Sequence, residues 1–168
     1  MKHVAPLRLL AAFALVLMSL LSACKDTPAA GPTAPAPTAP VTRPGPKVVF
    51  PTKSGPIEVS VVIARTSEEL QRGLMFVDKL EAGRGMLFLM PERRIQRFWM
   101  KNTYIPLDMI FIDEDLKVVG LVENAEPHSE TSRFVDHPSR YVLEVRGGYA
   151  KKVGIEPGQT VSFVGVPL

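Results

Sequence analysis

Short segments in which apolar and polar residues alternate recur between residues 57 and 166. In the clearest, residues 57–63, isoleucine or valine occupies every second position, and Glu58 and Ser60 stand between them. A period of two predicts a strand with one buried face. Apolar content and turn residues predict six further strands, over residues 86–90, 95–104, 107–113, 116–123, 141–145 and 160–166.

Two short helices interrupt this pattern. Thr66 and Glu69 have the spacing of a capping box, and Gly73 is a natural C-terminal stop for the helix that they open. A second helix is predicted over residues 149–153, ended by Gly154. Parallel sheets need long crossover helices, which the pattern does not contain. The fold class predicted is therefore mainly β: a compact antiparallel β-sandwich or small barrel with two short helices.

Residues 1–23 have the pattern of an export signal. Lys2 and Arg8 precede an apolar run over residues 9–21, which as a helix would extend roughly 20 Å, less than the ~30 Å hydrocarbon core of a bilayer. The run ends in LSAC, residues 21–24, which resembles the lipobox of bacterial lipoproteins. The resemblance implies that Cys24 carries the lipid that anchors the protein to a membrane. The alternative is an ordinary signal peptide with an incidental cysteine.

The residues after Cys24 indicate which membrane of the envelope would hold the lipid anchor. In Gram-negative lipoproteins, which the segment resembles, an aspartate directly after the cysteine favours retention in the inner membrane. Here Lys25 occupies that position and Asp26 comes one place later. The expectation is an exported protein, anchored in the cell envelope, with the outer membrane facing the periplasm favoured over the inner membrane.

Residues 24–46 differ in composition from the rest of the chain. Seven of the 16 prolines lie in residues 25–46, together with alanine, threonine and glycine. Such a segment buries too little apolar surface to fold and favours extended polyproline II. The composition predicts a lipidated cysteine followed by a tether, which leads to a single β-rich globular domain over residues 47–168.

The net charge of +3 originates in these N-terminal segments. The chain has 20 basic and 17 acidic residues, but residues 47–168 contain 16 of each. Because the domain has no basic excess, its composition gives no reason to expect a nucleic-acid partner. Cys24 is the single cysteine, which excludes an intramolecular disulfide framework.

Several blocks of sequence occur in order through the domain. They read RGLMF at 72–76, GMLF at 85–88, FWMKNT at 98–103, IPLDMIFI at 105–112 and YVLE at 141–144, and Gly154, Ile155, Gly158 and Val161 complete the C-terminal part. Together they resemble a widespread prokaryotic family known as domain of unknown function 192. The resemblance implies a compact β-rich fold, in agreement with the alternation pattern, and implies no particular activity.

Asp108 is the most unusual residue of these blocks, because it stands between apolar neighbours on both sides. A buried carboxylate is very costly unless it is hydrogen-bonded. One interpretation is structural: Asp108 accepts hydrogen bonds from backbone N–H groups of the turn at residues 102–105. A second makes Asp108 a general acid or base of an enzyme that acts on envelope glycans, although no partner carboxylate stands at a diagnostic spacing.

A third interpretation is a ligand pocket. If residues 95–103 form a strand, Trp99 and Lys101 share a face with Arg97 and Thr103. The pocket would have an aromatic platform and a wall of polar side chains, with Arg72 and Glu144 as further polar residues inside the family blocks. The ligand-binding residues predicted are Arg72, Trp99, Lys101, Asn102 and Asp108.

No metal site or cofactor is predicted. The five methionines of the domain lie in apolar runs, where methionine is a routine core residue, and His128 and His137 have no zinc-site spacing. The function that the sequence favours is a non-catalytic binding or interaction module for a small polar ligand or an envelope component. The glycan-directed enzyme and a purely structural module for a protein partner remain alternatives.

Overall fold

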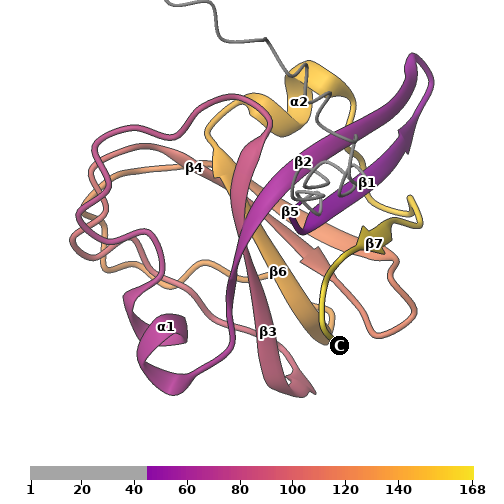
Figure 1. The fold of residues 1–168 in the computed structure, drawn as a ribbon. Helices are drawn as coiled ribbons and strands as arrows, with labels where there is room; N and C mark the ends of the chain where they lie inside the picture. The colour runs from indigo at the N-terminus through magenta and orange to yellow at the C-terminus, as the bar shows by residue number, and fades with distance from the viewer. Residues whose placement is uncertain (1–44) are drawn as a thin grey trace, which may run out of the picture. The chain divides into compact units, whose positions relative to one another are not determined.

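The structure, a computed structural model, describes residues 45–168. The predicted signal peptide, Cys24 and all but the last two residues of the tether lie outside the described residues. One seven-stranded sheet dominates the described part, with strand order β5-β4-β6-β3-β2-β1-β7 (Figure 1). Its strands are β1 (Lys47–Thr52), β2 (Gly55–Ala64), β3 (Arg84–Arg94), β4 (Leu107–Ile112), β5 (Val118–Ala125), β6 (Ser139–Arg146) and β7 (Ser162–Val164).

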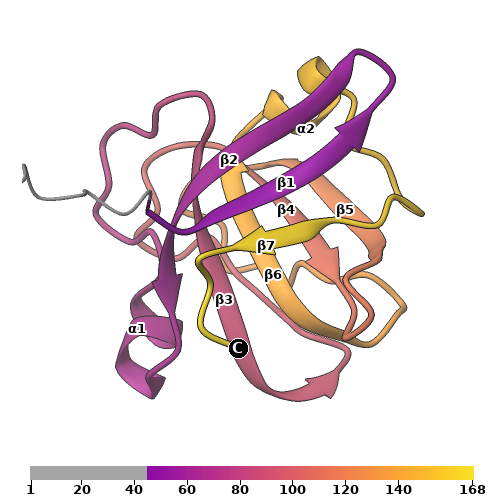
Figure 2. The ribbon, with the colours of Figure 1, turned by 45° about the vertical axis from the view of Figure 1, so that its right-hand side comes forward.

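The prediction of a mainly β domain with two short helices is confirmed. The helices are α1 (Ser67–Arg72) and α2 (Tyr149–Val153), and they lie at opposite ends of the sheet (Figures 1 and 2). Both parts of the α1 capping box are formed: Glu69 N donates to Thr66 Oγ1 at 3.2 Å, and Thr66 N donates to Glu69 Oε2 at 2.9 Å. The backbone N–H groups of Thr66 and Arg65, which both donate to Glu69 Oε2, lower the pKa of the Glu69 carboxyl.

The sheet is mixed, which differs from the wholly antiparallel arrangement expected. Every neighbouring pair is antiparallel except β2 and β3, which run parallel because the chain crosses over between them through α1. The sheet also stays open. An isolated bridge between Lys117 and Thr160, and the hydrogen bond of 2.8 Å from Val161 N to Leu116 O, connect the start of β5 to the segment before β7 without closing the ladder.

Two hydrophobic cores lie on the two faces of this curved sheet. The first core unites strands from both halves of the sheet, with Val48 and Phe50 of β1 packed in the same cluster as Ile110 and Ile112 of β4. Figure 2 shows why: β1, β2 and β7 pass across β4, β5 and β6. The second core lies on the opposite face of the sheet, where Leu74 after α1 and Met100 of the loop cover the strands. The buried members of this core are Ala64, Leu74, Phe88, Met100, Leu107, Met109, Phe111, Ala125 and Val142.

The strand prediction needs correction at two places. Residues 95–104 form no strand; they are an irregular loop in which only Phe98 makes a bridge, to Arg133. The first strand, β1, was not predicted at all. Within β3, Pro91 and a register shift between Leu89 and Arg94 interrupt the ladder to β6, which resumes at the pair of Arg94 with Ser139 before the chain leaves the sheet.

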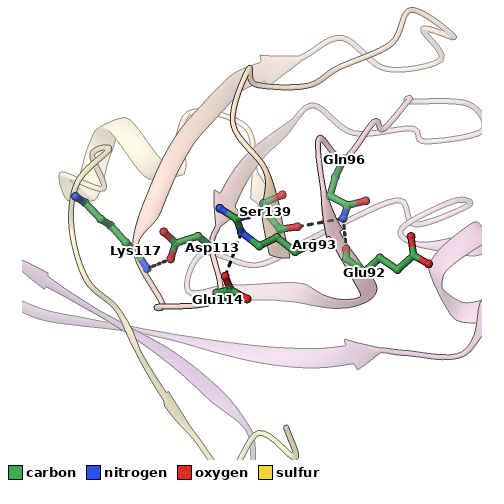
Figure 3. Close-up of polar contacts among 7 residues, drawn as sticks. All are labelled: Glu92, Arg93, Gln96, Asp113, Glu114, Lys117 and Ser139. Carbon is green, nitrogen blue, oxygen red and sulfur yellow. Dashed lines mark hydrogen bonds and ion pairs between the residues drawn. The ribbon is translucent and has the colours of Figure 1, made fainter.

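The start of the loop is held by a buried amide. Gln96, 2% exposed, donates through Nε2 to Glu92 O at 2.8 Å and to Ser139 O at 3.1 Å (Figure 3). Beside it, Arg93 Nε lies 3.4 Å from Glu114 Oε1 in the turn between β4 and β5. The side chain of Gln96 thus connects the end of β3 to the start of β6 and directs residues 97–103 towards α1.

Candidate binding site

A hollow of about 370 Å³ lies between α1 and the loop at residues 99–102, and we name it the outer cleft. Its lining residues are Glu68, Gln71, Arg72, Met75, Phe76, Trp99, Lys101 and Asn102. Four of the five residues predicted to bind a ligand therefore meet here: Arg72, Trp99, Lys101 and Asn102. They do so although the strand on which Trp99 and Lys101 were expected to share a face does not exist.

The backbone contact that holds the two walls of the outer cleft together involves two unusual residues. Phe76 N donates to Asn102 O at 2.8 Å, and both residues have positive φ, 64° at Phe76 and 53° at Asn102. A positive φ is uncommon for a bulky residue such as phenylalanine and indicates that tertiary contacts hold it there. The side-chain amide of Asn102 also points at Met75, with Nδ2 4.0 Å from Sδ.

Trp99 forms an accessible aromatic platform. Its side chain is 46% exposed, and Lys101 Nζ stands 5.3 Å from the ring centroid. The same ammonium group lies 3.5 Å from Glu130 Oε1, which orients it beside the ring. Phe76, 53% exposed, packs edge-to-face on Tyr104 with ring centroids 6.0 Å apart. Exposed aromatic rings bordered by cations and amides can bind a ligand that has both an apolar face and polar groups.

Asp108 lies outside this cleft, which corrects its assignment to the pocket wall. The residue is 0% exposed. Its Oδ1 accepts from Asn124 N at 2.7 Å and from Gly148 N at 2.9 Å, and its Oδ2 accepts from Ala150 N at 2.8 Å. The structural interpretation was therefore right about backbone donors but wrong about which ones, because the donors belong to the end of β5 and the start of α2 rather than to residues 102–105.

A second buried carboxyl lies under the outer cleft. Glu144 of β6 is 4% exposed and borders a cavity of about 220 Å³, which we name the inner cavity. Burial raises the pKa of the Glu144 carboxyl to about 8. Among residues 45–168, no side chain or backbone group forms a hydrogen bond or an ion pair with it.

Glu144 was noted from the sequence as a polar residue of the family blocks but was not among the predicted ligand-binding residues, although its position carries a stronger signal. Glu144 stands between Leu143 and Val145 in an otherwise apolar strand, which is the same anomaly that singled out Asp108. The strand register places the two carboxylates on opposite faces, since Asp108 pairs with Val145 and Glu144 pairs with Met109. Glu144 therefore borders the inner cavity, whereas Asp108 lies on the other face of the sheet.

Neither a cluster of metal-ligating side chains nor a membrane-spanning helix is found among residues 45–168. No group of three or more histidine, cysteine, aspartate or glutamate side chains gathers anywhere in residues 45–168. No helix in that part of the chain has the length and apolar content required to span a membrane.

Fold and cleft together define a small, mainly β domain with a ligand-sized hollow at the edge of its second core. The chain belongs to the DUF192 family, described as "Uncharacterized ACR", whose model matches residues 49–163. The predicted family membership is therefore confirmed. No curated protein matches the chain.

Two solved structures resemble the domain closely. A protein of unknown function from Novosphingobium aromaticivorans is 40% identical with a TM-score of 0.67, over 69% of this chain and 83% of that one. A protein from Sinorhizobium meliloti, called a "putative transcription regulator", is 38% identical with a TM-score of 0.68, over 72% of this chain and 95% of that one. Both support the fold, and the family itself is uncharacterised.

Proposed function

We propose that the domain is a non-catalytic binding module whose outer cleft takes a small polar ligand of the cell envelope. The observation that carries the proposal is the convergence of Arg72, Trp99, Lys101 and Asn102 from two distant segments on one hollow. Its volume of about 370 Å³ lies within the range of roughly 300–1,000 Å³ that is usual for small-molecule sites.

The chemistry of the cleft favours a ligand such as a sugar ring. The flat face of a sugar can rest on the exposed side of Trp99, while its hydroxyl groups meet the amides of Gln71 and Asn102 and the carboxylate of Glu68. Arg72 forms no ion pair among residues 45–168, so its five donors are free for the ligand's acceptors. The glycan-directed enzyme loses support, because the oxygens of Asp108 accept three backbone hydrogen bonds and the residue has no exposed surface.

Trp99 supplies the readout for a binding experiment, because it is the only tryptophan of the chain. Titration with saccharides, nucleotides and amino acids is expected to identify a class that changes its fluorescence saturably. For a ligand of that class, Arg72→Gln should weaken binding by about tenfold or more, since loss of a charge-assisted hydrogen bond costs roughly 1.5–3 kcal/mol. The change in dissociation constant measures this directly.

The matched control is Arg84→Gln. Arg84 is also exposed, but it begins β3 and is absent from the lining of the outer cleft. Its replacement should leave the dissociation constant within about threefold of wild type, because a distant surface charge contributes little. Equal weakening by both variants, or no fluorescence response to any of the three ligand classes, would contradict a ligand site at Trp99 and leave the protein-partner module as the better explanation.

We also propose that the protein is exported and held in the envelope by lipid on Cys24, with the outer membrane favoured. The support is the LSAC sequence directly after the apolar run of residues 9–21. Mass spectrometry of the mature protein is expected to find Cys24 at the N-terminus with diacylglyceryl and acyl groups attached. A mature N-terminus with an unmodified Cys24, or one that begins elsewhere, would refute the anchor; density-gradient separation of the membranes then tests the outer location.

A further inference from the structure

The inner cavity adjoins the outer cleft and shares part of its wall. Gln71, Arg72, Met75 and Trp99 line both. Its volume of about 220 Å³ is smaller than the roughly 300–1,000 Å³ of a complete small-molecule site. The inner cavity therefore suits one substituent of a ligand whose main body lies on Trp99.

Polar side chains, Gln71, Arg72, Arg97 and Thr103 beside Glu144, form part of the wall of the inner cavity, and apolar side chains form the rest. The apolar side chains come from α1 and the turn after it, from β3 and from the loop, and they are Leu70, Leu74, Met75, Phe88, Met90 and Phe98. Gly73 keeps the space open near Glu144: a Cβ at this position would lie 3.1 Å from Phe88 Cζ and 4.0 Å from Glu144 Oε2. An apolar group of a ligand would be well accommodated against these walls.

Few charged groups face Glu144. On the neighbouring strands its register partners are Met86 of β3 and Met109 of β4, neither of which titrates. The other charged lining residues are Arg72 at the end of α1 and Arg97 in the loop, and the guanidinium of Arg97 lies over the ring of Phe134, 4.0 Å from its centroid. Neither arginine forms an ion pair with Glu144, so the carboxyl faces the cavity without a partner among residues 45–168.

A buried carboxyl without a partner indicates what the cavity would accept. Among residues 45–168 the fully inaccessible side-chain atoms that lack a hydrogen bond are Arg133 Nε and Ser139 Oγ, so the Glu144 oxygens face the space of the cavity and can meet a hydrogen-bonding group of a ligand there. The desolvation that raises the pKa of Glu144 also penalises a charged ligand group. The best complement is an uncharged group with a hydrogen-bonding atom and a small apolar end.

We propose that the inner cavity is a subsite for the acetamido group of an N-acetylated amino sugar, with the Glu144 carboxyl as hydrogen-bonding partner of the amide and the apolar wall around the methyl group. The inference rests on the proposed binding function of the outer cleft and names the ligand class. The sugar ring lies on Trp99, at the junction of the two hollows. The amide enters because it is neutral, polar at one end and apolar at the other.

The test compares three trisaccharides by the fluorescence of Trp99 in the full protein. They are the trimer of N-acetylglucosamine, the trimer of glucosamine, which carries ammonium groups, and cellotriose, which carries hydroxyls at the same positions. The acetylated trimer is expected to bind at least tenfold more tightly than the other two. Glu144→Leu should abolish this preference, and Glu144→Gln, whose amide keeps the shape and the hydrogen bonds, should preserve it.

The outcomes separate the inference from the function on which it rests. Equal affinities for the three trimers, or a preference that survives Glu144→Leu in a protein with an unchanged circular dichroism spectrum, would overturn the subsite and leave the outer cleft as a binding site. Loss of the preference in both Glu144 variants would also count against a hydrogen bond to the amide. If no trimer changes the fluorescence of Trp99 but another ligand class does so in an Arg72-dependent manner, the acetamido assignment falls and the binding function stands.

Discussion

Replacing Asp108 with alanine is expected to destabilise the domain by roughly 3 kcal/mol or more. The substitution removes the acceptor of three backbone N–H groups, those of Asn124, Gly148 and Ala150, and each buried donor left unsatisfied costs about 1–3 kcal/mol. Small domains have only about 5–15 kcal/mol of stability in total, so a large part of it would be lost. Urea denaturation followed by far-UV circular dichroism measures the free energy of unfolding.

Asp113 offers the matched control. Its Oδ1 also accepts a backbone hydrogen bond, from Lys117 N at 2.8 Å, but it accepts only that one and lies in an exposed turn (Figure 3). Asp113→Ala is therefore expected to cost about 1 kcal/mol or less. Similar losses in the two alanine variants would show that the three contacts of Asp108 do not hold β5 to α2.

A conservative variant separates this structural role from a catalytic one. Asp108→Asn keeps one oxygen for two of the donors and places an amide NH₂ against the third, so we expect a stability between those of wild type and Asp108→Ala. Because Asp108 does not line the outer cleft, ligand affinity in the folded variant should stay within about threefold of wild type. A selective loss of binding without loss of stability would return Asp108 to the candidate site.

Local sequence signals predicted most of the fold correctly. Alternation located β2, and the acidic turn between two apolar runs located the β4–β5 hairpin, because these features depend on neighbours in the sequence. Residues 95–104 were misleading for a physical reason. Phe98 and Met100 pack inwards while Arg97 and Trp99 face outwards, and an irregular segment that covers a core can show the same alternation as a strand.

Contacts between distant segments could not be predicted in the same way. An isolated polar residue in an apolar strand indicates burial with a partner but does not say which partner: the donors to Asp108 are 16, 40 and 42 positions away in the sequence. The parallel pairing of β2 with β3 depends on how the chain crosses over through α1. Three of the four predicted residues that line the outer cleft, Trp99, Lys101 and Asn102, belong to the FWMKNT block. They were therefore predicted together because they are close in the sequence, and not because their arrangement in space could be predicted.

Glu144 is expected to make the stability of the domain strongly dependent on pH. Burial raises the pKa of its carboxyl from 4.5 in the unfolded chain to about 8 in the folded domain, so the folded state binds the proton more tightly. The stabilisation that this tighter proton binding gives the folded domain is complete below about pH 4.5, decreases as the pH rises, and is lost above about pH 8. Within that window the free energy of unfolding should fall by up to roughly 1.4 kcal/mol per pH unit through this group.

Glu144→Gln isolates this contribution, because glutamine has nearly the same shape and does not titrate. Urea denaturation of both proteins from pH 5 to pH 9 is expected to show the variant gaining several kcal/mol relative to wild type, and the difference between the two curves cancels the other titrating groups. Glu126→Gln, an exposed glutamate, should follow wild type throughout. Parallel curves for wild type and Glu144→Gln would mean that Glu144 loses its proton as readily in the folded domain as in water. The inner cavity would then tolerate charge, and the reason for expecting an uncharged ligand group there would disappear.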